Sequence, residues 1–264
     1  MLGAALAEVA ASFGLRYLQL GGAKSLTARE RANWLQDAAS TVLQRAGMKV
    51  VADGTPPPHG LVVSNHLSYL DVLAYASTMP CAFVAKQEVR GWPIFGAFAT
   101  MAGTIYVNRE RRTANNHAVA LMEEALTAGL RVVLFPEGTS SDGRQMLRFH
   151  SGFFEPAVRT NAVVTTAAIA YASSTAEEAA LAYHGDDVFG THLVRTLGQR
   201  HLEARVVFAT EGKRYVSRKD AARATQSEVE LLRSGLAGSA ATQPSMDSAP
   251  DSVPMDPLRL TLTG

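Results

Sequence analysis

Short apolar runs alternate along this chain with longer segments in which apolar residues recur every three or four positions. The short runs predict buried strands, at 48–51, 60–63, 81–85, 104–107, 131–135, 162–170 and 204–209. The longer segments predict helices, at 27–47, 70–77, 91–98, 113–127, 151–159, 187–197 and 217–236, with a short helix capped by 175–178. This alternation places the chain in the α/β class, with a mixed, largely parallel sheet flanked by helices.

The two ends of the chain differ from its middle. Residues 1–24 form an apolar N-terminal segment, in which residues 1–20 are interrupted by Glu8 and Arg16, are short for a bilayer span and lack a basic leader. We expect an N-terminal helix there that either lies in a membrane interface or packs on the core. Residues 25–236 then form the main domain. Residues 237–264 are rich in Ser, Pro, Gly and Asp, which predicts a disordered tail.

Composition narrows the classes of function. The formal net charge is +1, so the overall balance does not indicate a nucleic-acid partner. Cys81 is the only cysteine, which excludes an internal disulfide and a thiolate metal cluster. Because Cys81 lies in an apolar run, we interpret it as a small core residue.

The stretch Ser64–Asp71 separates a predicted strand from a predicted helix. His66 lies on the connecting loop, and Asp71 lies in the first helical turn, where its carboxylate can fold back toward the imidazole. This is the chemical logic of a histidine general base with an aspartate partner, although no protein nucleophile is evident beside it. The same residues also fit a capping box with Ser68 as N-cap, and both readings stay open.

A second polar stretch, Phe135–Ser141, follows the strand at 131–135. Open α/β sheets place ligands at the carboxyl ends of their strands. Gly138 permits close backbone approach, while Glu137 and Thr139 supply acceptors and donors for a polar headgroup. The alternative is an ordinary turn that contains a glycine.

A third polar stretch follows the strand at 104–107 and contains Arg109, with Arg111 and Arg112 close by. Planar guanidinium groups at a strand end suit a phosphate. Lys86, after another strand, can join the same electropositive mouth. The alternative is a solvated basic loop.

The order of these motifs resembles the lysophospholipid acyltransferase family, whose members include 1-acylglycerol-3-phosphate acyltransferases. The matching residues are Asn65-His66 followed by Asp71, then Gly103 to Arg109, then Phe135 to Thr139. The resemblance covers about residues 60–170, and more loosely the chain to about 210. It implies a glycerolipid acyltransferase-like α/β fold.

The resemblance also implies an activity and a set of roles. The family transfers a fatty acyl group from acyl-CoA or acyl carrier protein to a lysolipid hydroxyl, without a metal or other cofactor. His66 would deprotonate that hydroxyl, which attacks the thioester directly, and Asp71 would orient His66. The expected substrate contacts are Asn65, Lys86, Arg109, Glu137, Gly138 and Thr139.

Two departures leave the acceptor open. His150 stands where the family often has Lys or Arg, and the strand beginning 162–167 lacks the family's proline. The stretch 83–93 also looks like the branch that acylates lyso-ornithine lipid. The first choice is therefore 1-acyl-sn-glycerol-3-phosphate, giving phosphatidic acid, and the alternative is lyso-ornithine lipid.

Rival classes of function remain. One is a non-catalytic lipid-binding protein on the same fold, against which the intact His66 and Asp71 argue. Another is a hydrolase with Ser64 or Ser68 as nucleophile, but neither serine lies in a Gly-x-Ser-x-Gly elbow.

The resemblance implies membrane lipid and lysolipid as partners. It places the protein at the cytoplasmic face of the inner or plasma membrane, as a peripheral or monotopic protein. The N-terminal segment and a second apolar cluster at 92–98, with Trp92, Pro93, Ile94, Phe95 and Phe98, are candidates for docking on the lipid. The alternative is that both are buried core helices.

Overall fold

The computed structural model describes residues 2–19, 26–92, 95–108 and 112–240. The strands in this part of the chain are β1 (Lys49–Asp53), β2 (Gly60–Val63), β3 (Ala82–Lys86), β4 (Ile105–Val107), β5 (Arg131–Leu134), β6 (Val164–Ala172) and β7 (Glu203–Phe208). They form one sheet in the order β1-β7-β6-β2-β5-β3-β4. Neighbouring strands are parallel, except that β6 and β7 are antiparallel. The predicted mixed, largely parallel sheet is confirmed.

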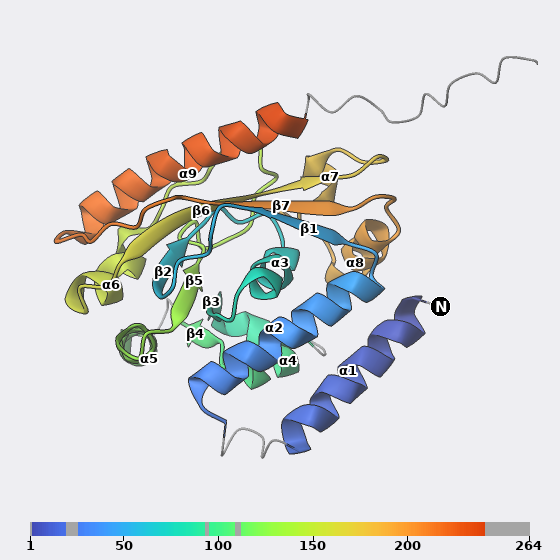
Figure 1. Cartoon of the computed structure of the whole chain (residues 1–264), viewed down its shortest axis with the longest axis horizontal. Coiled ribbons are helices and arrows are strands. Elements are labelled where there is room, and N and C mark those ends of the chain that lie inside the picture. The colour runs from blue at the N-terminus through green and yellow to red at the C-terminus, as the bar shows by residue number, and fades with distance from the viewer. Residues whose placement is uncertain (1, 20–25, 93–94, 109–111, 241–264) are drawn as a thin grey trace, which may run out of the picture.

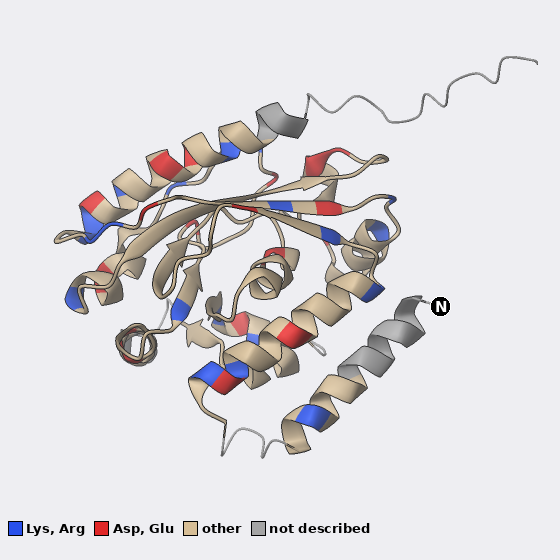
Figure 2. Cartoon of the chain, in the orientation of Figure 1, with Lys and Arg blue, Asp and Glu red and all other residues tan. Residues whose placement is uncertain are grey.

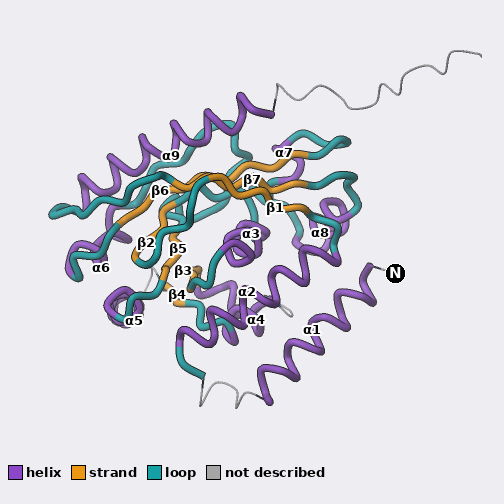
Figure 3. The backbone as a smooth tube through the Cα atoms, viewed as in Figure 1, coloured by secondary structure: helices purple, strands orange, loops and turns teal. Residues whose placement is uncertain are grey.

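Helices cover both faces of this sheet. They are α1 (Leu2–Gln19), α2 (Ala28–Arg45), α3 (Leu70–Thr78), α4 (Phe95–Met101), α5 (Arg112–Thr127), α6 (Glu155–Arg159), α7 (Glu178–Leu181), α8 (Phe189–Leu197) and α9 (Arg218–Ala240), with 3₁₀ turns η2 (Gln87–Gly91) and η3 (Ser151–Phe154). Helices α2, α3 and α4 pack on one face, and α5, α6 and α9 pack on the other (Figure 1). The tube view shows the strands enclosed between these two helical layers (Figure 3).

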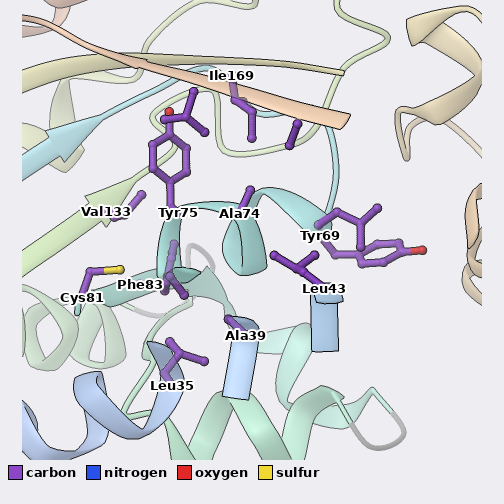
Figure 4. Packing of buried hydrophobic residues seen from close by; sticks show 14 of the residues in the cluster. Leu35, Ala39, Leu43, Tyr69, Ala74, Tyr75, Cys81, Phe83, Val133 and Ile169 are labelled. Carbon is purple, nitrogen blue, oxygen red and sulfur yellow. The ribbon is translucent and has the colours of Figure 1, made fainter. Parts of the chain in front are cut away.

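Each face of the sheet has its own hydrophobic core. Strand β6 contributes to both, because Ile169 joins the cluster under α2 and α3 while Ala168 joins the cluster under α5 and α9. This alternation follows from the period of two residues in a strand. Part of the first cluster is shown in Figure 4, where Tyr75, Cys81 and Phe83 are among the labelled residues. Cys81 is fully buried and free, as predicted.

Several predicted boundaries need correction. The segment at 91–98 is not one helix, because Gly91 ends η2 and Trp92 is extended, while α4 covers Phe95–Met101 and residues 93–94 lie outside the described part. The short helix α7 has Glu177 as its N-cap, with no capping bond from a side chain, so the expected cap within 175–178 does not form. Helix α9 continues to Ala240, beyond the predicted end at 236. The rest of the expected disordered tail, 241–264, lies outside the described residues.

Helix α1 lies along α2 (Figure 1). One side of it is buried, since Phe13 and Tyr17 pack edge-on against the Trp34 ring of α2. Its other side is exposed, with Leu15 58% and Leu18 70% accessible. Between 11 and 19 its charge is a single arginine, whereas α2 carries both signs (Figure 2). No described helix is both long and apolar enough to traverse a bilayer.

The sheet order brings the polar motifs to one edge. Strands β2 and β5 are parallel neighbours, with Val63 opposite Leu134, so the chain leaves both strands at the same level. Strands β3 and β4 end together as well, with Lys86 opposite Val107. The loops that follow these strands can therefore build a single site, as in other open α/β sheets.

Strand β2 begins at a glycine that the close packing of the sheet requires. Gly60 has φ +103°, and a Cβ atom there would lie 2.4 Å from the carbonyl oxygen of Val163. Gly47 also has positive φ, +68°, but a Cβ there would meet nothing within 4 Å. Alanine substitutions at the two glycines therefore distinguish the free-energy cost of backbone strain from that of a steric collision.

We expect Gly60→Ala to lower the free energy of unfolding by about 3 kcal/mol, because strain and collision add. Gly47→Ala should cost only about 1 kcal/mol, which is the strain of the left-handed conformation alone. Denaturant unfolding of both variants measures the difference. Equal losses would show that the neighbouring strand yields freely at Gly60.

Candidate active site

His66 follows β2 and lies at the centre of the site. Its Nδ1 is 2.8 Å from Oδ2 of Asp71, so the contact predicted from the sequence is present. A carboxylate only accepts hydrogen bonds, so Nδ1 carries the proton and Nε2 is the acceptor in the neutral ring. The ring stacks on Phe135, with centroids 4.3 Å apart and planes 11° apart. These contacts hold the imidazole in one orientation.

Asp71 is fully buried, and in the described part of the chain its carboxylate accepts hydrogen bonds from four donors. Besides His66, Oδ2 accepts from the backbone N–H groups of Leu67 at 2.7 Å and Ser68 at 3.1 Å. The hydroxyl of Tyr171 donates to Oδ1 at 2.5 Å. Four donors explain how a charged carboxylate persists without water.

The proposed N-cap of α3 needs correction. The N-cap is Tyr69 and not Ser68, although Ser68 Oγ accepts the backbone N–H of Leu70 at 3.3 Å. Asp71 accepts from Ser68 N, as the reciprocal half of a capping box would, and contacts His66 at the same time. The capping box with Ser68 as N-cap is therefore not formed, while the contact of Asp71 with His66 is present.

Glu137 is buried directly beside this loop. One carboxylate oxygen accepts the backbone N–H of His66 at 2.8 Å, and the other accepts that of Leu147 at 2.9 Å. Burial raises the pKa of Glu137, while the bonds from Leu147 and His66 oppose the rise. Both oxygens of Glu137 therefore hold backbone groups of the site, and its contact with a substrate headgroup stays a prediction.

Asn65 also has a structural role that the sequence did not predict. Its Nδ2 donates to the carbonyl oxygen of Ile169 at 3.0 Å, and its Oδ1 accepts the N–H of Ile169 at 2.9 Å. The side chain therefore continues the pairing of β2 with β6 beyond the strand end. This buried amide is engaged on both sides, and its contact with substrate stays a prediction.

The two serines proposed as hydrolase nucleophiles are fully buried. Ser64 Oγ receives the hydroxyl of Tyr75 at 2.6 Å and lies 3.4 Å from Oδ1 of Asn65. Ser68 Oγ caps Leu70. Both hydroxyls are engaged away from solvent, which disfavours a hydrolytic nucleophile.

Gly138 and Thr139 lie where the sequence placed them, at the edge of the site. Gly138 has φ +70°, and its N–H donates to the Phe135 carbonyl at 3.0 Å, which forms the turn after β5. Ser141 N donates to the carbonyl oxygen of His66 at 3.0 Å, and Ser140 Oγ donates to the Tyr183 carbonyl oxygen. The turn thereby attaches to the His66 loop and to the segment before α8.

Of the predicted basic residues, the structure locates one at the site. Lys86 ends β3, is exposed and lines the same cavity as His66. Arg109, predicted to bind a headgroup, and Arg111 lie outside the described residues, and Arg112 begins α5. Because β4 ends at Val107 beside Lys86, the chain nevertheless enters the Arg109 segment from this edge.

A cavity of about 550 Å³ adjoins His66. This volume is within the range of small-molecule sites, and the lining is mostly apolar. It extends between α2, α3, α4 and α8, and its rim includes Gly138 and Thr139. Among its apolar lining residues are Leu35, Leu73, Trp92, Phe95, Phe98 and Leu193.

Several aromatic residues around the site were not predicted from the sequence. Tyr69 and Tyr183 line the cavity, with their ring centroids 5.4 Å apart. The Tyr69 hydroxyl is hydrogen-bonded to Nδ1 of the buried His192 ring at 3.0 Å. Tyr171, which contacts Asp71, was also missed. Its two-residue spacing from Ile169 on β6 could have placed it on the same face.

We compared the chain with known proteins. The model of the family described as Acyltransferase matches residues 49–170, which include all eight candidate site residues. A 1-acyl-sn-glycerol-3-phosphate acyltransferase from Neisseria meningitidis serogroup B is 33% identical over 163 residues. That alignment covers 61% of this chain and 64% of the Neisseria protein, so it spans less than two thirds of that relative.

A longer alignment joins the chain to a lyso-ornithine lipid O-acyltransferase from Rhizobium meliloti, with 32% identity over 224 residues and 76% of each protein covered. Among solved structures, the 1-acyl-sn-glycerophosphate acyltransferase PlsC from Thermotoga maritima has a similar fold. Its TM-score is 0.58 at 17% identity, with 93% of this chain and 100% of that chain covered. The sequence matches, with this fold beside them, show that the chain belongs to the lysophospholipid acyltransferase family.

Proposed function

We propose that this protein transfers a fatty acyl group from acyl-CoA or acyl carrier protein to the free hydroxyl of a lysolipid. The acceptor we propose is 1-acyl-sn-glycerol-3-phosphate, and the product is phosphatidic acid. The observation that carries the proposal is the His66–Asp71 pair, 2.8 Å apart, beside an apolar cavity of about 550 Å³. The pair supplies a base, and the cavity suits an acyl chain.

The reaction follows from the atoms at the site. Nε2 of His66 takes the proton of the acceptor hydroxyl while the hydroxyl oxygen attacks the thioester carbonyl. The positive imidazolium is stabilised by the carboxylate of Asp71, which is fully buried and 2.8 Å from Nδ1. The C–S bond then breaks, an ester forms, and the thiolate takes the proton from His66 to leave as a thiol. No step needs a metal ion or a covalent acyl-enzyme.

The polar rim of the cavity suits the headgroup of the acceptor. Lys86 lies at the cavity, and Arg109 is two residues beyond the neighbouring strand end. An ammonium group and a guanidinium group together suit the negative charge of a phosphate. Gly138 and Thr139 at the cavity offer a close backbone and a hydroxyl, and Glu137 holds the His66 loop beside them.

A second acceptor, lyso-ornithine lipid, is favoured by one observation. The Rhizobium relative named for that activity aligns with 76% of this chain, against 61% for the Neisseria relative. The two acceptors differ in the headgroup that the basic rim would meet. Mass spectrometry of the lipid products, with each acceptor supplied separately, distinguishes them.

We also propose that α1 docks the protein on the cytoplasmic face of a membrane. Its inner side packs on Trp34, so it is attached to the domain, and its outer side exposes Leu15 and Leu18. An apolar face on a helix with few charges suits the lipid interface. Trp92, Phe95 and Phe98 of the second predicted docking cluster line the cavity, while Pro93 and Ile94 lie outside the described residues.

Thioester consumption tests the function. The wild-type protein should release thiol from acyl-CoA or acyl carrier protein only when a lysolipid is present, because the acceptor hydroxyl is the nucleophile. His66→Ala should lower kcat by about 10²–10⁴, the usual contribution of a general base.

The control is His59→Ala, which removes an exposed loop histidine seven positions earlier and should keep full activity. Thiol release without acceptor would indicate a hydrolase. No release under either condition, with lipid still bound, would indicate a lipid-binding protein.

Arg109→Ala should raise KM for the lysolipid more than KM for the donor, because the proposed mechanism assigns this guanidinium group to binding of the acceptor headgroup. Arg109→Lys should restore part of the loss, since the charge returns without the bidentate fork. Arg29→Ala, an exposed arginine on α2, is the matched control. An unchanged kcat/KM for the acceptor in Arg109→Ala would refute the assignment.

Replacing Leu15 and Leu18 together by Glu should reduce flotation with anionic vesicles, because the exposed side of α1 would lose its apolar contact with lipid. Leu231→Glu changes a leucine of similar exposure, 74%, on α9 at the other side of the molecule, and should float like the wild type (Figure 1). Equal flotation of all three proteins would remove α1 as the docking element.

A further inference from the structure

The two carboxylate oxygens of Asp71 have different partners. Oδ2 contacts the His66 ring and two backbone N–H groups of the same loop. Oδ1 has a single recorded partner among the described residues, the hydroxyl of Tyr171, at 2.5 Å. Because Asp71 is fully buried, this hydroxyl is what satisfies the side of the carboxylate that faces away from His66.

Tyr171 is held in place independently of its hydroxyl. It lies on β6, paired with Ala204 of β7, and only 5% of it is exposed. Its backbone N–H donates to Glu178 at 2.7 Å, and Glu178 is held in turn by Arg233 of α9. The main chain of β6 therefore stays fixed if only the hydroxyl is removed.

The Tyr171 phenol remains a donor across the working pH range. Burial raises its pKa well above the ordinary value, and the neighbouring charge of Asp71 raises it further. A neutral phenol that donates to a carboxylate draws part of the negative charge toward itself. The charge that Asp71 presents to His66 is correspondingly smaller.

We propose that Tyr171 is a positioning residue for the reaction, which acts through Asp71 by orienting its carboxylate and moderating the charge that reaches His66. The expected effect of Tyr171 on the reaction rate rests on the proposed function, whereas its effect on Asp71 and His66 does not. Without the hydroxyl, the unshared charge of Asp71 favours the protonated imidazole, and a protonated His66 is no longer a base.

Other titratable groups face the same cluster and must be kept constant. Glu137, on the loop after β5, approaches His66 and Asp71, and Tyr75 approaches Asp71 from α3. Glu178 approaches Tyr171 from the start of α7 and is paired with Arg233. None of these is altered when Tyr171 loses only its hydroxyl.

The test is Tyr171→Phe, with Tyr75→Phe as the matched control. Both remove a hydroxyl from a buried tyrosine of the same core, but the Tyr75 hydroxyl bonds to Ser64 and not to Asp71. We expect Tyr171→Phe to lower kcat/KM at neutral pH about 10-fold, as for the loss of a hydrogen bond to a charged group. The acid limb of its pH profile should move to higher pH, while that of Tyr75→Phe stays at the wild-type position.

A second readout does not require activity. In NMR spectra of the full chain, with His66→Ala used to assign the ring signals, the pH at which the His66 signals change should rise in Tyr171→Phe and stay constant in Tyr75→Phe. Incorporating 3-fluorotyrosine at 171 makes the phenol a stronger donor without removing it, and should move the signals in the opposite direction. This variant also serves if Tyr171→Phe folds poorly.

The outcomes separate the two proposals. If wild-type protein acylates a lysolipid but neither substitution at 171 moves the acid limb or the His66 signals, the positioning role of Tyr171 is wrong. Equal movement in Tyr75→Phe would also overturn it, because any buried hydroxyl would then suffice. If the His66 signals move as expected but the protein acylates no lysolipid, the positioning role stands and the proposed function fails.

Discussion

The buried carboxylate of Asp71 is the constraint on which the site depends. An ionised group removed from water is tolerated only when donors surround it, and Asp71 has donors from His66, Leu67 and Ser68 on its own loop and from Tyr171 on β6. Satisfying this charge therefore determines the path of the loop between β2 and α3. The orientation of the His66 ring follows from that path.

Glu137 completes the arrangement from the neighbouring strand. The N–H groups of three consecutive residues, His66 to Ser68, donate to the two buried carboxylates. The carbonyl oxygens of His66 and Leu67 accept the backbone N–H groups of Ser141 and Tyr183. A loop with both donors and acceptors paired is preorganised before any substrate arrives. Such preorganisation is what positions a base against a reacting hydroxyl.

The apolar surroundings serve the same chemistry. The helices on one face of the sheet leave a largely hydrophobic cavity next to His66, and Phe135 is both a wall of that cavity and the stacking partner of the ring. An acyl chain placed there would exclude water from the base. The exposed leucines of α1 lie on the same helical layer, so substrate entry from lipid and docking on lipid are compatible with one orientation.

The sequence by itself determined the α/β class, the strands that carry the polar motifs and the pairing of His66 with Asp71. These follow from local periodicity and from two residues only five positions apart in the chain. Only the tertiary structure decided the roles of Asn65, Glu137 and Tyr171, because their partners lie 104, 71 and 100 positions away. Asn65 and Glu137 had been expected to contact substrate, yet both are engaged by backbone groups. Which buried polar atoms meet depends on the order of strands in the sheet, and that order is set by the packing of the whole chain.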